Sequence, residues 1–120
     1  MAFAARGSSS TMIQRDYILR LIAEAARFVA LALGLQQRGE DGRLYLDRAS
    51  RALTGQPLEV VEALDADALL GLCAPRGTFV PELAVALADV LYAAGDAARA
   101  RPLYDAARAA GAAVPLHALV

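Results

Sequence analysis

Apolar residues recur at intervals of three and four in the first third of the sequence, and this spacing constrains the fold more than any other feature. Ile18, Ile22, Ala25, Val29 and Ala32 follow the spacing without a break, which places them on one face of an α-helix. Ala fills 29 of the 120 positions, and Ala and Leu are strong helix formers. We therefore predict an all-α protein whose first helix covers residues 12–38.

Two polar residues indicate where this helix begins. Thr11 followed by Gln14 has the form of a capping box, in which the two side chains accept hydrogen bonds from backbone N–H groups of the first turn. The preceding residues are short and polar, unlike a secretory signal. We predict a disordered extension over residues 1–11 and a single α-helical domain over residues 12–120, because a chain of this length has room for one core.

Glycine and proline divide the rest of the chain into shorter helices. The "RGEDGR" stretch at residues 38–43 is typical of a polar turn, so the first two helices should form a hairpin. Pro57 and Pro81 suit the first turn of a helix, where the missing N–H would be unpaired in any case. The segment 81–94 contains only two charged residues, and we expect it to be the most buried element.

The last two predicted helices resemble a tetratricopeptide repeat, a helix–turn–helix unit that stacks into arrays. Small residues let its helices approach closely, a glycine permits the turn, and a tyrosine fills the space between neighbouring pairs. The matching positions are Leu87, Ala88, Gly95, Asp96, Ala100, Tyr104 and Ala107. The resemblance implies antiparallel helical hairpins in a tetratricopeptide-like array. We expect Gly95 to be left-handed at the end of one helix and Asp96 to cap the next.

A second resemblance involves the start of the predicted domain. The stretch "MIQRDYILRLI", with the later "ALLGLC" and "YAAGDAARARPLYDAA", is similar to a bacterial family of uncharacterised helical proteins. The resemblance covers most of residues 12–110 and implies a helical-repeat fold without an activity. It singles out Asp16, Tyr17 and Arg20 as a candidate polar binding surface. The alternative is an exposed ion pair between Asp16 and Arg20 beside a core tyrosine.

The charge balance argues against two classes of partner. Twelve basic residues stand against 13 acidic ones, whereas nucleic acid and anionic lipid attract clustered positive charge. The most apolar stretch, residues 17–35, contains Arg20, Glu24 and Arg27, and each would cost about 2 to 3 kcal/mol at the centre of a bilayer. We predict no nucleic-acid partner, no transmembrane segment and a cytoplasmic location.

The sequence offers no evident set of side chains for catalysis. His117 is the only histidine and lies in the C-terminal tail, whereas a nucleophile needs a base positioned beside it. Cys73, the only cysteine, lies among apolar residues and is predicted to be a buried structural thiol. We therefore predict no enzymatic activity, no metal and no cofactor. An enzyme would need a pocket that gathers two or more of Asp16, Glu24, Asp47 and Glu62.

The candidate partner interface lies in the last turns of the first predicted helix. The polar stripe of this helix becomes apolar at Leu31 and Leu35, beside Phe28. A domain this small has difficulty covering these residues, so we predict an interface at Phe28, Leu31 and Leu35, with the C-terminal "VPLHALV" as the competing intramolecular cover.

These observations favour a non-enzymatic helical-repeat module that binds a protein partner or forms a homo-oligomer, with a dimer favoured. The alternative is a small-ligand- or lipid-binding helical bundle, whose apolar first helix lines a cavity or lies on a membrane surface.

Overall fold

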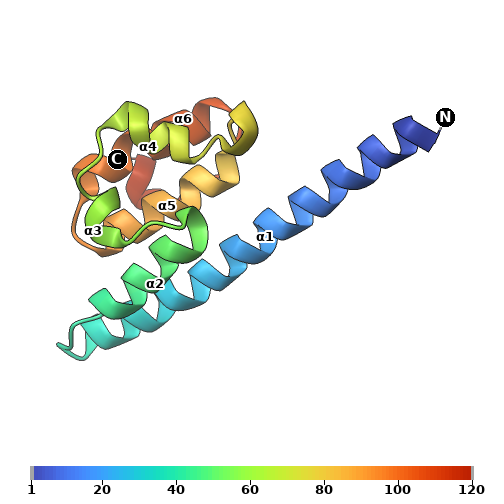
Figure 1. Ribbon diagram of the computed structural model, residues 1–120. Helices are drawn as coiled ribbons and strands as arrows, with labels where there is room; N and C mark the ends of the chain where they lie inside the picture. Colours follow the sequence, from blue (N-terminus) through green and yellow to red (C-terminus); the bar gives the residue numbers. More distant parts are fainter. Residues whose placement is uncertain (1, 120) are drawn as a thin grey trace.

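The computed structural model describes the backbone of residues 2–119 and the side chains of residues 15–119. All the regular secondary structure of the described chain is helical and it contains no strand, which confirms the all-α prediction (Figure 1). Its elements in order are α1 (Ala2–Gln37), α2 (Arg43–Thr54), α3 (Leu58–Val61), α4 (Ala66–Leu72), the 3-10 turn η1 (Pro75–Gly77), α5 (Pro81–Ala93), α6 (Ala97–Ala109) and the 3-10 turn η2 (Leu116–Leu119).

Helix α1 begins at Ala2, about three turns before the predicted start. The structure therefore differs from the disordered extension predicted for residues 1–11. This segment contains no proline and is rich in alanine, so its backbone can continue the helix in the N-terminal direction. The predicted capping pair, Thr11 and Gln14, falls among residues whose side chains lie outside the described part of the chain.

Helices α1 and α2 form the predicted hairpin (Figure 1). Gly42 makes this close packing possible: it is buried at the start of α2, and a Cβ atom there would lie 2.6 Å from the backbone oxygen of Ala32 in α1. One turn further along the pair, the rings of Phe28 and Tyr45 stack with their centroids 6.3 Å apart. Helix α2 thus covers one side of the C-terminal half of α1.

Helices α5 and α6 form the second hairpin. Gly95 has a φ of 88°, and the Asp96 side chain accepts a hydrogen bond from the backbone N–H of Arg99, as predicted for this turn. Helix α6 continues through Pro102. As expected, α5 contributes more buried residues than any other helix of the described chain, namely Leu83, Ala84, Leu87, Ala88, Val90 and Leu91.

Helix α5 joins the two hairpins, because it packs against α1, α2 and α6. It runs in the same direction as α1: Ile22 and Glu82 line the same hollow, and further along the side-chain amide of Gln36 donates a hydrogen bond to the carbonyl oxygen of Ala93 at 3.0 Å. The N-terminal half of α1 projects beyond the other helices (Figure 1). The molecule is consequently elongated, with extents of 58, 25 and 24 Å.

Candidate functional site

An open groove of about 700 Å³ lies between α1 and α5. We call it the α1–α5 groove. Its α1 wall consists of Ile22, Ala25, Ala26, Val29, Ala30 and Leu33. Its α5 wall consists of Glu82, Val85, Ala86 and Asp89, and residues 111–113 also line the groove. The lining is therefore apolar apart from two carboxylates, both on α5.

The groove exists because small side chains occupy the facing surfaces of the two helices. Ala26 and Ala30 on α1 and Ala86 on α5 are too short to fill the space above the line of contact. Ala26 and Ala30 are exposed, and Leu33 keeps 43% of its surface exposed. The groove is thus open along its length and does not enclose a cavity.

A smaller hollow of about 330 Å³ continues the groove towards the N-terminus of α1. It lies between Arg15 and Leu19 on α1 and the segment that contains η1, and it shares Ile22 and Glu82 with the larger hollow. The two together follow α1 from Arg15 to Leu33, a distance of about 27 Å along a helix axis. The combined groove is long enough to hold several helical turns.

Asp89 links the groove to a buried polar cluster. Its carboxylate accepts a hydrogen bond from the Tyr104 hydroxyl of α6, and the oxygen of that hydroxyl lies 3.1 Å from Nε2 of His117. A tyrosine hydroxyl has one proton to donate, so His117 must donate from Nε2 to the Tyr104 oxygen. Burial raises the pKa of Asp89 above its ordinary 3.8, while the Tyr104 hydrogen bond opposes that shift. The cluster holds this carboxylate in place at the groove.

The same cluster fixes the C-terminal tail on α5 and α6. The His117 ring stacks on Tyr92 of α5, with centroids 3.8 Å apart and an interplanar angle of 16°. The neighbouring Ala118 is buried. The sequence placed His117 in the C-terminal tail but did not predict these contacts, because no local pattern links it to Tyr92 and Tyr104. The only sequence feature that could have indicated these contacts is the histidine itself, which is the one polar side chain in an otherwise apolar tail.

The structure separates the three residues of the predicted partner interface. Phe28 is half-buried against Tyr45 of α2, and Leu35 is also half-buried. Leu31 remains 50% exposed. The tail that was considered as an alternative cover packs against Tyr92 instead. Because α2 approaches α1 from the Phe28 side, it covers part of this surface and leaves Leu31 open.

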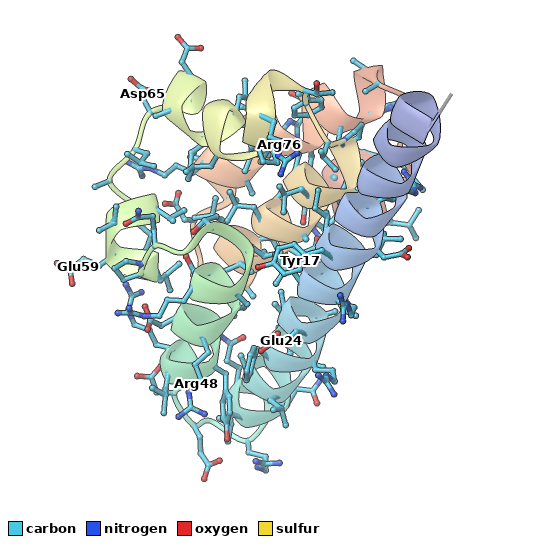
Figure 2. The ribbon with its side chains drawn as sticks, turned by 45° about the vertical axis from the view of Figure 1, so that its right-hand side comes forward. Tyr17, Glu24, Arg48, Glu59, Asp65 and Arg76 are labelled. Atoms are coloured by element: carbon cyan, nitrogen blue, oxygen red, sulfur yellow. The ribbon has the colours of Figure 1, made fainter. Side chains whose placement is uncertain are left out.

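The candidate polar surface lies on the exposed side of α1. Asp16 and Arg20 are exposed there, and Tyr17 keeps 54% of its surface exposed, so it is not the core aromatic considered as an alternative. Figure 2 shows Tyr17 and Glu24 along the same helix. Asp16, Tyr17 and Arg20 therefore lie on the helix that forms one wall of the groove, but they do not line either of the two hollows described above.

The acidic residues named for an enzyme pocket are not gathered at one site. Asp47 accepts hydrogen bonds from the backbone N–H of Leu58 and from Arg51. Glu62 is bound by Arg43, which donates to it at 3.2 Å. Both pairs belong to α2 and the segment after it, whereas Asp16 and Glu24 are exposed on α1. The hydrogen bonds from Arg51 and from the Leu58 N–H lower the pKa of Asp47 below its ordinary 3.8.

Two further features bear on the chemistry available. Burial raises the pKa of the Cys73 thiol to about 12, so the thiol stays protonated and unreactive at neutral pH. Asp65 caps α4 by accepting from the Ala68 N–H at 2.8 Å, and with Glu59 it points away from the helices (Figure 2). Within residues 15–119, no group of three or more histidine, cysteine or acidic side chains is placed to hold a metal ion.

Comparisons with known proteins leave the geometry as the basis for assigning a function. None of the helices in the described chain has the length and apolar character needed to cross a membrane. No protein family model matches the sequence, and no curated protein or solved structure matches it significantly.

Proposed function

We propose that this protein is a non-enzymatic interaction module that binds an apolar helical segment, from a protein partner or from a second copy, in the α1–α5 groove. The observation that carries the proposal is the open α1–α5 groove, whose lining is apolar apart from two carboxylates on α5. The smaller hollow, which is lined also by Arg15, Arg76 and Thr78, extends it along α1 to about 27 Å. Helix recognition of this kind inserts residues spaced i, i+3, i+4 and i+7 into a groove.

The small side chains of the groove support a helical occupant. Ala26 and Ala30 on one wall and Ala86 on the other let a third helix approach the backbones closely. The exposed Leu33 at one end and Leu19 at the other offer larger apolar contacts. Glu82 and Asp89 would favour an occupant with basic residues beside its apolar face.

A tetratricopeptide-like arrangement belongs to the same proposal. The α5–α6 hairpin has the glycine turn and the interhelical tyrosine of such a repeat, and α1–α2 would serve as a degenerate neighbouring unit. Helical-repeat modules bind partners on surfaces formed where successive hairpins meet. The α1–α5 groove lies at the junction of the two hairpins.

Site-specific photo-cross-linking tests the proposal. A photoreactive amino acid replaces Ala30 in the groove, and a matched control carries it at Ala68, an exposed alanine on α4. Irradiation in the producing cells should yield an adduct from position 30 whose linked segment has apolar residues at helical spacing, and none from position 68. Equal labelling from both positions, or no polypeptide adduct from position 30, would contradict helix binding.

A small-ligand- or lipid-binding bundle is the second candidate, because a volume of about 700 Å³ falls in the range of ligand pockets. The exposure of Ala26, Ala30 and Leu33 argues against it, since ligand pockets bury most of the ligand surface. Native mass spectrometry and liposome flotation separate the two. A co-purified small molecule, or flotation that is lost when Leu33 is replaced by Glu, would favour the second candidate.

A further inference from the structure

We propose that the occupant of the α1–α5 groove is helix α1 of a second copy, so that two chains pair through their α1 helices in antiparallel orientation. This inference rests on the proposed function, because it names the partner of the same groove. Four independent features of the chain favour a second copy: the spacing of exposed residues on α1, their order, the distribution of charge, and the length of α1.

The first feature is an exposed seam on α1, which we define by its five members. They are Leu19, Ala23, Ala26, Ala30 and Leu33, and all five are exposed. Their spacing of four, three, four and three residues is the a/d repeat of a coiled coil, which positions side chains to pack into a facing helix. Leu19 and Leu33 are 42% and 43% exposed, so the seam presents two large apolar side chains to solvent.

The second feature is that the seam reads the same in both directions. Its order is leucine, three alanines, leucine, so an antiparallel copy places its alanines over the alanines and its leucines over the ends. Small residues at the centre let the two backbones come close. A symmetric dimer requires such a self-complementary surface, because each chain presents the same patch to the other. An unrelated partner helix imposes no such symmetry.

The third feature is a charge asymmetry between α1 and the remainder of the chain. Helix α1 contains four arginines and two acidic residues, whereas the rest contains eight arginines and 11 acidic residues. The wall opposite α1 in the groove carries Glu82 and Asp89. A second α1 is therefore a net basic helix that would face this acidic wall in the α1–α5 groove, while Arg76 lines the smaller hollow beyond it. Antiparallel pairing also aligns the two helix dipoles favourably.

The fourth feature is the reach of α1 beyond its own domain. The helix has 36 residues, or about 54 Å, whereas the molecule measures only 25 and 24 Å across. Most helical stability in proteins comes from tertiary packing of an apolar face. Between Arg15 and Ile22, α1 and the η1 segment of its own chain line the smaller hollow, and a second α1 would fill that space.

Sedimentation velocity over a wide concentration range tests the pairing. We expect the wild type to sediment with twice the mass of the chain. Replacing Ala26 by Glu at the centre of the seam should give a folded monomer, because the residue is exposed in the single chain. The matched control, Ala68→Glu, should remain dimeric, since a glutamate there extends the Asp65 cap of α4.

Two results of this experiment would overturn the inference. One is a wild type that is monomeric at every concentration, and the other is an Ala26→Glu variant that keeps the dimeric mass. Circular dichroism shows whether each variant is folded. If Ala26→Glu fails to fold, the wild-type mass and the distance measurement below decide the question without it.

Spin labels at residue 16 test the antiparallel direction in an otherwise wild-type chain. Asp16 is exposed, so Asp16→Cys accepts a label, while the native Cys73 is buried and serves as the unlabelled background. Antiparallel pairing centred near Ala26 separates the two labels by about 30 Å along the axis. Parallel pairing would bring them to about 10 Å. A short distance, or no intermolecular distance, would overturn the proposed arrangement.

The cross-link from position 30 separates failure of this inference from failure of the proposed function. An adduct to a second copy of the chain supports both. An adduct to a helix of a different protein supports groove binding and overturns the second copy as its occupant. The absence of any polypeptide adduct contradicts both.

Discussion

Replacing Gly42 by alanine should weaken the packing between α1 and α2 in the first hairpin. A Cβ atom at this position would lie 2.6 Å from the backbone oxygen of Ala32, 2.8 Å from its Cα and 2.9 Å from its Cβ. Two of these atoms belong to the backbone of α1, so the contact cannot be relieved by rotating a side chain. The φ of Gly42 is −95°, a value open to any residue, so the expected loss comes from packing alone.

The size of the loss follows from two opposing effects. Inserting atoms into a packed interior costs about 1 to 3 kcal/mol, and a backbone contact at 2.6 Å places this site at the upper end. Alanine also restricts the unfolded chain, which offsets about 0.4 to 1 kcal/mol. We expect a net decrease of about 1.5 to 2.5 kcal/mol in the free energy of unfolding.

Gly34→Ala provides the matched control. Gly34 lies inside α1, and apart from its own helical turn no atom lies within 4 Å of a Cβ added there. Alanine there should stabilise the protein by about 0.5 to 1 kcal/mol through helix propensity. Urea unfolding followed by far-ultraviolet circular dichroism, at one fixed protein concentration, measures both variants. Changes of the same sign at positions 42 and 34 would refute the packing argument.

Three further predictions concern the second hairpin. Gly95→Val should lower the unfolding free energy by about 1 kcal/mol or more, because residue 95 has a φ of 88°, and an unchanged melting temperature would contradict this. Burial raises the pKa of Asp89, so the contribution of the protonated carboxyl group to the free energy of unfolding is complete below pH 3.8 and is lost as the pH rises through the shifted pKa. Asp89→Asn should therefore make the melting temperature decline less steeply over this pH range. Melting curves across the acid range that show the same decline in the variant would contradict this reasoning. Pro102→Ala should stabilise α6 by up to about 3 kcal/mol, because it restores a backbone donor inside the helix, whereas chemical denaturation showing a loss would indicate that the proline ring is required for packing.

The sequence by itself determined the helices and the turns between them. The three- and four-residue spacing in α1 and the Gly95–Asp96 turn are local, because helix hydrogen bonds join residues four apart and a cap lies within one turn of its helix. The high burial of α5 was also predictable, since a segment with two charges has no polar face to present to water. The N-terminal limit of α1 was not, because a capping signal does not prevent a proline-free segment before it from being helical.

Only the tertiary structure decided which surfaces are covered and which polar groups meet. The sequence grouped Phe28 and Leu31 in one candidate interface, but the approach of α2 covers the first and leaves the second exposed. The contact of Asp89, Tyr104 and His117 joins two helices and the tail, and the groove depends on which helix α5 packs beside. Such contacts link residues far apart in the chain, so their formation depends on how whole helices pack against one another and is not encoded in any local spacing.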